Sequence, residues 1–580
     1  MSRDFLLASA AALCLAKAAG AADLSPAAWP VAERARLEAL EQSPYPSAAR
    51  VVMSSRGGEI VSATLSPVAV HAGMQALRQG GTAADAAIAV AFTQTATDLG
   101  AVISYAGVAE LIYYEAATGR TYAMDAGWAS WSGEREPASI PTPDMTLLGG
   151  GAGGAGAQGR KTLVPGFMAG MEAAHHRFGR LPFADLLQPA IWYARYGVTV
   201  TPLLAFYFSH EKDTLARTPE GRAFLAQAGD ALPKAGDRFV QPELAHTLSG
   251  VARDGARYMY DGPWASAYVE TVRREGGAAS LDDLRLYRVV WDEPLSTRYA
   301  GATVTGPGVS STGGCAVLMA LNLLDALGGP KLGAPSRDPD SFAVQTRVAR
   351  FAASESWSPH FAGDCASRMK REWAVATAPK IANETGETGQ AGHHSAAVVV
   401  VDRWGNVAAL VHSINSLMWG ETGLVVGGIP IGSPAAVNRY RLVNLAPGAR
   451  LPTDMAPLIA FRDGRPVAAV ASIGASLVPE TVRVAAGLLD GEDLAELAAA
   501  PPMLMGLGAS VPGGEKPALI PTDAYAPQFK AAVEAAGVKL QEVPPAQTAA
   551  LRGTAAFVRI GPNGASAAEA PSVIVFSEAR

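Results

Sequence analysis

The chain has few cysteines, three among 580 residues, and it contains neither a Cys-x-x-Cys nor a His-Glu-x-x-His motif. Without ligand spacing of this kind a zinc enzyme is not expected, and we predict no metal and no cofactor. Cys315 and Cys365 are the two thiols outside the N-terminal segment. The sequence does not say whether their Cα atoms lie within bridging distance, so their pairing stays open.

Charge is also sparse. Charged residues make up 17% of the chain and hydrophobic residues 49%, and 47 basic against 53 acidic residues leave a net charge of −6. Such a balance gives no long-range attraction to nucleic acid or to an acidic membrane, so neither is expected as a partner. The composition is that of a well-packed globular protein of one or two compact bodies, for which a small molecule or a peptide is the expected substrate.

Long apolar runs are missing beyond the N-terminus. Residues 1–23 place Arg3 ahead of an apolar stretch that ends in small residues, which resembles a secretory signal peptide cleaved near Ala21 or Ala22. No other stretch approaches the roughly 20 apolar residues that cross a bilayer. We therefore expect a signal peptide over 1–22 and a mature protein that is soluble, membrane-free, and periplasmic or secreted.

Hydrophobic spacing predicts helices and strands along the rest of the chain. A glycine-rich loop over 147–161 lacks the Gly-Lys-Ser/Thr ending of a phosphate cradle, so it is not interpreted as a nucleotide site. From residue 396 onward short strands alternate with helical segments, which indicates a sheet covered by helices. The other expected elements are a buried helix over 80–100, two strands around a turn at Gly119, two helices over 167–196, a helix capped by Ser280, a helix capped by Ser311 or Thr312, and helices over 480–499 and 527–537.

A serine stands behind two histidines at the start of an apolar run, in the sequence GHHSAAVVVVDRWGN. The valines that follow favour a strand, and the Asp402 region supplies turn residues, so Ser395 should lie at the first residue of a buried strand. That position suits a serine that becomes a chain terminus after cleavage. A metal site at His393 and His394 is disfavoured, because neighbouring side chains on an extended segment point to opposite faces.

Several motifs together resemble the γ-glutamyltranspeptidase family of N-terminal-nucleophile hydrolases, from about residue 50 to the C-terminus. Each motif alone is weak, but their order and spacing are specific. They are GGTAADAAIAVAFT, LVPGFMAGMEAAHHRFGRLPFADLLQPAIWYA, SLDDLRLYRVV, SSTGGCAVLMALNLL and HSAAVVVVDRWGNVAALVHSIN. The resemblance implies an α+β fold, a four-layer αββα sandwich made as a precursor that cleaves itself between His394 and Ser395. It implies a large subunit over 23–394 and a small subunit over 395–580 as partners.

The chemistry expected of Ser395 follows from its new terminus. A freed α-amine has a pKa near 7.7 to 8, so cleavage would create the nucleophilic hydroxyl and its general base in one residue. The family has threonine here, and serine keeps the hydroxyl but loses the methyl that restricts χ1. By resemblance Ser413 orients the nucleophile, and the backbone of Gly474 and Ala475, where the family has two glycines, stabilises the oxyanion. Asn415 is expected to project from the same strand face as Ser413 and to contact the substrate.

The residues expected to recognise a γ-glutamyl group differ from the family pattern. Gly127 replaces the arginine that grips the α-carboxylate, and a glycine cannot make that charge-assisted contact. Thr453 and Asp454 replace a pair of serines, and the run before Asn438 lacks the family's acidic residue. These absences should weaken recognition of glutathione by orders of magnitude. Nearness in sequence alone suggests that Arg439, Asp454 and Trp419 build a different pocket.

Two functions remain open at this point. The first is an exported amidohydrolase or acyltransferase, like a γ-glutamyltransferase or glutathione hydrolase, that cleaves a small-molecule or peptide amide through an acyl-enzyme. The second is a secreted binding protein that kept the fold and lost turnover, since a fold does not guarantee an activity. The sequence does not identify the acyl group, rank hydrolysis against transfer, or give the oligomeric state.

Overall fold

The computed structural model describes residues 22–42, 49–142, 156–228, 232–356, 361–381, 395–416, 418–504, 517–571 and 574–580. The signal peptide predicted over 1–22 therefore lies outside the described residues except for Ala22. Most of the glycine-rich loop and the histidine pair at 393 and 394 also lie outside them.

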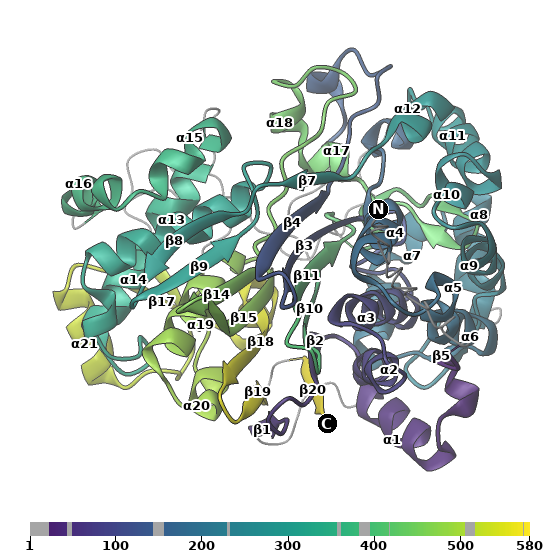
Figure 1. The fold of residues 1–580 in the computed structure, drawn as a ribbon. Coiled ribbons are helices and arrows are strands. Elements are labelled where there is room, and N and C mark those ends of the chain that lie inside the picture. Colours follow the sequence, from purple (N-terminus) through teal and green to yellow (C-terminus); the bar gives the residue numbers. More distant parts are fainter. Residues whose placement is uncertain are drawn as a thin grey trace, which may run out of the picture.

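Two antiparallel sheets of seven strands form the centre of the molecule (Figure 1). In spatial order the first sheet is β1 (Arg50–Met53), β19 (Gly564–Glu569), β18 (Gly553–Gly561), β15 (Arg465–Gly474), β14 (Leu458–Arg462), β9 (Ala302–Gly306) and β8 (Leu295–Tyr299). The second sheet is β20 (Val575–Ala579), β2 (Ile60–Thr64), β10 (Ala396–Val401), β11 (Val407–Ser413), β3 (Val108–Glu115), β4 (Arg120–Ala126) and β7 (Val290–Asp292).

Strands from distant parts of the chain are interleaved in both sheets. The hairpin of β10 and β11 lies between β2 and β3, and pairs antiparallel with both. In the other sheet β1 pairs with β19, and β9 pairs with β14. Both seven-stranded sheets therefore mix strands from before and after residue 395, and the two parts of the chain form one body.

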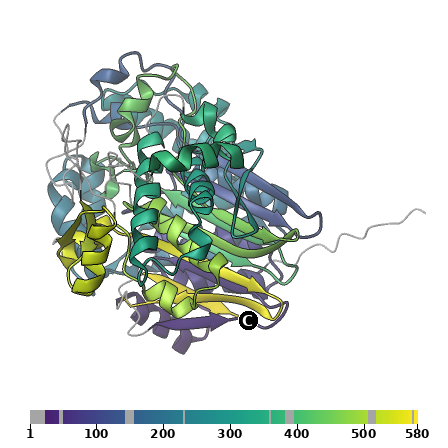
Figure 2. The same cartoon turned by 90° about the vertical axis from the view of Figure 1, so that its left-hand side faces the viewer.

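Helices cover the outer face of each sheet and complete four layers (Figures 1 and 2). On the second sheet lie α2 (Pro67–Arg78), α3 (Ala83–Thr97) and α4 (Phe167–Phe178). On the first lie α13 (Thr312–Ala326) and α19 (Leu477–Asp490), and α14 (Pro339–Ser356) packs on these two helices. The remaining α-helices are α1 (Val31–Gln42), α5 (Phe183–Leu186), α6 (Gln188–Tyr196), α7 (Pro202–Leu215), α8 (Pro219–Leu225), α9 (Pro242–Asp254), α10 (Arg257–Tyr260), α11 (Pro263–Arg274), α12 (Leu281–Leu286), α15 (Phe361–Arg368), α16 (Arg371–Ile381), α17 (Pro434–Val437), α18 (Arg439–Leu442), α20 (Leu494–Ala499), α21 (Pro527–Ala535) and α22 (Pro545–Leu551).

Three short two-stranded sheets lie outside these layers. They are β5 (Val198–Thr199) with β6 (Arg238–Phe239), β12 (Val425–Val426) with β13 (Ile429–Pro430), and β16 (Ala518–Pro521) with β17 (Leu540–Val543). The αββα sandwich predicted from the family resemblance is confirmed.

Strand alternation decides which side chains enter each layer of the core. In β10, Ala397, Val399 and Val401 pack between the two sheets, whereas Val398 and Val400 pack against the helices of the second sheet. All five are buried. Both faces of a central strand are therefore apolar, because both are covered.

The elements predicted from hydrophobic spacing are largely confirmed. The helix expected over 80–100 is α3, which begins with a capping box at Thr82, and the strand pair around Gly119 is β3 and β4. Ser280 caps α12, and Ser311, rather than Thr312, caps α13. The second helix expected within 167–196 is divided into α5 and α6, with Pro189 in the first turn of α6.

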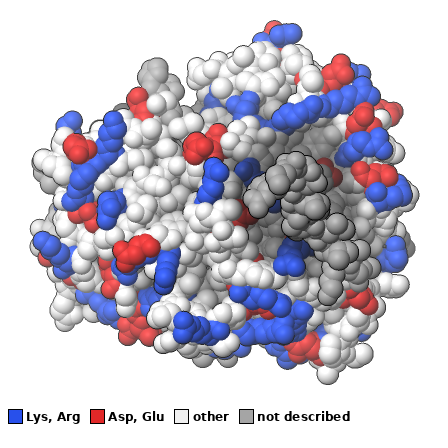
Figure 3. Space-filling view, viewed as in Figure 1, with Lys and Arg blue, Asp and Glu red and all other residues white. Residues whose placement is uncertain are grey.

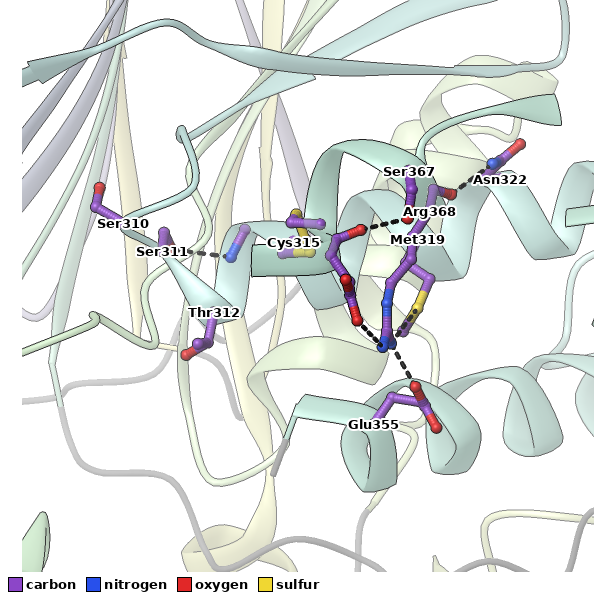
Figure 4. Close-up of a disulfide and its surroundings, with 12 residues drawn as sticks. Ser310, Ser311, Thr312, Cys315, Met319, Asn322, Glu355, Ser367 and Arg368 are labelled. Atoms are coloured by element: carbon purple, nitrogen blue, oxygen red, sulfur yellow. Dashed lines mark hydrogen bonds and ion pairs between the residues drawn. A yellow bond between two sulfur atoms is a disulfide. The ribbon is translucent and has the colours of Figure 1, made fainter. Parts of the chain in front are cut away.

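A disulfide joins Cys315 of α13 to Cys365 of α15, with the two Cα atoms 5.8 Å apart (Figure 4). The sequence left this pairing open. Both cysteines are fully buried. Because Cys315 is in the first turn of α13, the bond fixes the end of the helix that begins at Thr312, which contributes to the candidate site described below.

On the face seen in Figure 3, acidic and basic side chains are interspersed without a broad region of one sign. This distribution agrees with the small net charge of −6. Within the described ranges, none of the helices is both long enough and apolar enough to cross a bilayer.

Candidate active site

Ser395 lies immediately before β10 and is buried, as predicted. The register of β10 and β11 pairs Ala396 with His412, so the next pair outward is Ser395 with Ser413. Both positions continue the alternation of side chains that face the space between the sheets. The structure therefore brings the predicted nucleophile and its predicted orienting hydroxyl to opposite positions at one end of the sandwich.

The far end of the β10 and β11 hairpin is fixed by Asp402. Its Oδ1 accepts the backbone N–H groups of Trp404 and Asn406 at 2.9 and 3.0 Å, and its Oδ2 accepts the N–H of Ala83 at 2.9 Å. Because Ala83 is the first residue of α3, this carboxylate joins the hairpin turn to the helix packed behind it. The hairpin that carries Ser395 is thus held at its turn as well as along both edges.

Asn415 does not share the strand face of Ser413, and that prediction is wrong. Strand β11 ends at Ser413, and Asn415 has a left-handed backbone with φ +51°, so alternation no longer applies. Its N–H instead donates to Ser413 Oγ at 2.7 Å. Its side-chain oxygen accepts a hydrogen bond from Asn438 Nδ2 at 3.1 Å. Asn415 therefore contacts the orienting hydroxyl through its backbone, which leaves its side chain on a separate network.

Gly474 ends β15 with φ +94°, and Ala475 follows in the turn before α19. A side chain at Gly474 is excluded, because a Cβ would lie 2.4 Å from the backbone oxygen of Arg552. Among the described residues the N–H of Ala475 takes part in no backbone hydrogen bond. A backbone donor that is not used by the fold is what an oxyanion site requires. The oxyanion role of Gly474 and Ala475 stays a prediction, with which this turn is compatible.

Thr453 contacts a buried acidic pair that the sequence analysis missed. Thr453 Oγ1 lies 2.7 Å from Oε2 of Glu110, which is on β3 opposite Asp125 of β4. Both carboxyl groups are 1% exposed and follow the alternation that faces the space between the sheets. Burial, and then the Asp125 carboxylate, raise the pKa of Glu110 well above its ordinary value. The environment beside Thr453 therefore favours the protonated form of Glu110.

Asp454 is neutralised by an arginine from α18. The guanidinium of Arg441 forms an ion pair with Asp454 Oδ1, and it also donates to Thr312 Oγ1 at 3.1 Å. Arg441 lies 3.4 Å from Asn438 Oδ1, and Asn438 in turn holds Asn415. The structure therefore links Asn415 to Asp454 through two residues that were not predicted as site residues. Figure 4 shows Thr312 at the start of α13, the helix that carries Cys315 of the disulfide.

Gly127 lies beside Thr453, where there is no room for a side chain. A Cβ at Gly127 would lie 2.7 Å from Asp125 Oδ1 and 2.8 Å from Thr453 Cγ2. Arg450 donates to the Gly127 oxygen at 2.6 Å, and Arg441, beside Thr312 and Asp454, is paired with the Asp454 carboxylate. The arginine of the family pattern is therefore absent at this position, and the side chains of Asp125 and Thr453 occupy the space that its Cβ would need.

The prediction that Arg439, Asp454 and Trp419 build one pocket is wrong for Arg439 and for Trp419. Arg439 donates to the backbone oxygen of Ile140 at 3.2 Å, and it is Arg441, two residues later, that pairs with Asp454. Trp419 is 1% exposed and stacks on Phe208 in the core.

The cleavage site includes His394, which lies outside the described residues. Within the described ranges, no three His, Cys, Asp or Glu side chains are grouped so that they could hold a metal ion.

Comparisons with known proteins agree with this architecture. The sequence model of the family described as Gamma-glutamyltranspeptidase matches residues 69–572. The Acylase ACY 1 proenzyme of Pseudomonas sp. (strain SE83) is 30% identical over 452 residues, 73% of this chain and 78% of the relative. The Glutathione hydrolase proenzyme of Bacillus subtilis (strain 168) is 27% identical over 474 residues, 73% and 77% of the two chains.

The fold is also similar to a solved structure. The crystal structure of cephalosporin acylase from Bacillus halodurans superposes with a TM-score of 0.75 at 21% identity, covering 92% of this chain and 98% of that one. At this identity the similarity shows the fold. The two sequence relatives and this structure all bear the names of enzymes, and none of them supports a binding protein without turnover.

Proposed function

The chain belongs to the γ-glutamyltranspeptidase family, and from this membership we propose that it is an amidohydrolase or acyltransferase that matures by cleavage before Ser395. The single observation that carries the proposal is the position of Ser395, which precedes a buried strand and faces Ser413 across the hairpin. Cleavage would give a large subunit that ends at His394 and a small subunit over 395–580. We further propose that the protein is exported to the periplasm or secreted, with the two subunits as each other's partners.

The reaction begins with a proton transfer within one residue. The free α-amine of Ser395 takes the hydroxyl proton as Oγ attacks the carbonyl carbon of the amide. The carbonyl oxygen becomes an oxyanion, which the backbone N–H groups of Gly474 and Ala475 stabilise. The C–N bond then breaks, and the leaving amine takes the proton from the α-ammonium. Water or an amine acceptor attacks the resulting ester, and its proton returns through the same α-amine to Oγ. Ser413 positions the hydroxyl throughout.

The surroundings of Gly127 favour an acyl group without an α-carboxylate. The family arginine is absent and Gly127 has no space for one, while the cations nearby are engaged with Asp454 and with the Gly127 backbone. Burying a carboxylate without a cationic partner is unfavourable, so a γ-glutamyl group should gain nothing from its carboxylate here. We therefore propose an acylase rather than a glutathione hydrolase as the function.

A set of four anilides tests this substrate class. The γ-glutamyl, glutaryl, 4-aminobutyryl and butyryl anilides differ only in the α-amine and the α-carboxylate. We expect removal of the carboxylate, from γ-glutamyl to 4-aminobutyryl, to change kcat/KM by less than about tenfold, whereas loss of an engaged charge normally costs 100-fold or more. A preference of more than 100-fold for the γ-glutamyl compound would show that another group binds the carboxylate.

Maturation is tested with Ser395→Ala. This variant should remain one uncut chain on a denaturing gel and turn over none of the anilides, whereas the wild-type protein should give two bands with Ser395 at the N-terminus of the smaller. Ser472→Ala is the matched control, because Ser472 is fully buried in β15, two residues before Gly474. It should mature and turn over like the wild-type protein. Normal maturation of Ser395→Ala would refute the assignment.

A further inference from the structure

Residues 22–24 are docked into the protein as an extended segment, far in sequence from the groups that hold them. The N–H of Ala22 donates to Asp185 Oδ2 at 2.8 Å, and the oxygen of Ala22 accepts from Gln188 Nε2 at 3.0 Å. The N–H of Leu24 donates to Gln188 Oε1 at 2.8 Å. Ala22 is 5% exposed and Leu24 is fully buried, and both belong to the core that includes α3 and α4. The fold therefore has a built docking position for residues 22–24.

The carboxylate of Asp185, where residues 22–24 dock, accepts hydrogen bonds from neutral donors. Its carboxylate is 8% exposed, its Oδ1 accepts from Gln188 Nε2 at 2.9 Å, and its Oδ2 accepts from Ala22. Within the described part of the chain no salt bridge includes it. A carboxylate so buried is normally paired with a cation, because desolvation of an unpaired charge is costly. The donor to Oδ2 is the backbone nitrogen of Ala22, which becomes a cation if the chain begins there.

We propose that the peptide bond between Ala21 and Ala22 is hydrolysed by an endopeptidase of the export pathway, and that the freed α-ammonium of Ala22 forms a buried ion pair with Asp185. Water supplies the hydroxyl to the carboxyl end of the released segment and a proton to the new amine, which is then protonated near neutral pH. Ala19-Gly20-Ala21 has the A-x-A spacing of small residues that such peptidases recognise. This inference goes beyond the proposed acyl transfer and does not depend on it.

The contacts of Ala22 distinguish the Ala21–Ala22 peptide bond from the Ala22–Asp23 bond as the cleavage site. Cleavage after Ala22 would remove both of its hydrogen bonds and leave Asp185 without its closest donor. The new terminus would then be Asp23, whose N–H faces Gln79 Oε1 at 2.9 Å in an exposed position. An ammonium gains more from a buried carboxylate than from an exposed amide. Cleavage after Ala21 therefore keeps the contacts described for Ala22 and Leu24 and adds a charge pair.

The ion pair would join the start of the mature chain to the helical layer behind the second sheet. Asp185 belongs to α5, and Gln188 begins α6, which packs on α3 and on the turn that follows Leu24. The role assigned to Asp185 is that of an anchor for the processed terminus.

Processing is tested first on the wild-type protein. The protein is produced with its full N-terminus in an export-competent bacterium, and the large subunit, or the whole chain if uncut at 395, is analysed by N-terminal sequencing and intact mass. The expected sequence is ADLSPAAW, beginning at Ala22. A terminus at Asp23, or an intact N-terminus in exported protein, overturns the proposal. A failure of the acyl-transfer proposal would leave this result unchanged, because the terminal peptide is read independently of activity.

The ion pair is tested by the reactivity of the new amine. The folded protein is reductively methylated near pH 7, and the labelling rate of the Ala22 amine is followed by mass spectrometry of the terminal peptide. Asp185→Asn should label at least about tenfold faster than the wild-type protein, since its amide keeps an acceptor for Gln188 but provides no charge. Asp23→Asn removes a neighbouring carboxylate and should label at the wild-type rate. Equal rates in wild-type and Asp185→Asn protein, or wild-type labelling as fast as in urea, would overturn the ion pair.

Discussion

Replacing Gly474 by alanine should impair both folding and catalysis, because the structure leaves no room for a methyl group. The backbone at this position has φ +94°, which costs a non-glycine residue about 1–3 kcal/mol. The new Cβ would lie 2.4 Å from the oxygen of Arg552, so the two must part by about 0.6 Å to reach 3.0 Å. Overpacking of this kind costs about 1–3 kcal/mol. The precursor should therefore lose about 2–6 kcal/mol of stability.

The same displacement should slow the chemistry. Moving the turn by a large fraction of an ångström shifts the N–H of Ala475 away from the developing oxyanion, and misplacements of about 1 Å cost on the order of 100-fold in rate. We expect Gly474→Ala to slow self-cleavage and to lower kcat on a butyryl anilide by about 10- to 100-fold, with a smaller change in KM. Timed denaturing gels, steady-state kinetics and thermal unfolding of the precursor measure the three effects.

The control for this substitution is Gly561→Ala in the neighbouring strand β18. A Cβ at Gly561 would meet the oxygen of Gly564 at 3.7 Å, an ordinary contact, and Gly561 is not among the glycines with positive φ. This variant should behave like the wild-type protein. If Gly474→Ala matures, turns over and unfolds like Gly561→Ala, the assignment of the oxyanion turn is wrong.

Three further predictions follow from the site and its supports. Gly127→Arg should lower the free energy of unfolding by about 1–3 kcal/mol, because its Cβ would contact Thr453, and it should not create a preference for γ-glutamyl substrates. A tenfold gain in kcat/KM for the γ-glutamyl over the 4-aminobutyryl anilide would contradict this. Removing both Cys315 and Cys365 by serine should cost about 4 kcal/mol for a crosslink spanning 50 residues, and an unchanged melting temperature would disprove it. The folded state raises the pKa of Glu110, whereas the unfolded chain releases this proton above a pKa near 4.5, so the wild-type protein loses stability as pH rises above that value. The melting temperature of Glu110→Gln should therefore rise relative to that of the wild-type protein between about pH 5 and pH 8. Parallel profiles of melting temperature against pH would refute the raised pKa.

The fold could be predicted from sequence because local signals and motif order agreed. The capped helix α3 and the strand pair around Gly119 were readable from spacing and turn residues alone. The αββα layering was not; it came from the family resemblance. Periodicity could not supply it, because strands covered on both faces are apolar throughout and do not reveal which face meets the other sheet.

The site was predicted only in part, because the positions of the remaining residues depend on tertiary packing that the sequence pattern does not show. Glu110 stands in the strand AELIYYE, where a single acidic residue gives no sign that it faces a second buried carboxylate across the strand pair. Arg439 and Arg441 are two residues apart, and only the packing of α18 decides which one reaches Asp454. Trp419 is turned inward by a left-handed backbone, φ +47°, that no propensity indicates for a tryptophan.

The interleaving of strands has a consequence for any cut before Ser395. The hairpin that begins there is bonded to an upstream strand along each edge, so the two pieces share no separable interface and would stay together without a covalent link. Parting them would require breaking both sheets, and neither piece alone contains a complete one. Maturation would then be irreversible in the thermodynamic sense: a cut molecule that unfolds has lost the tether that brought its strands together. Equilibrium stability should accordingly be measured on the uncut Ser395→Ala chain, and the cut form should be characterised by its rate of unfolding.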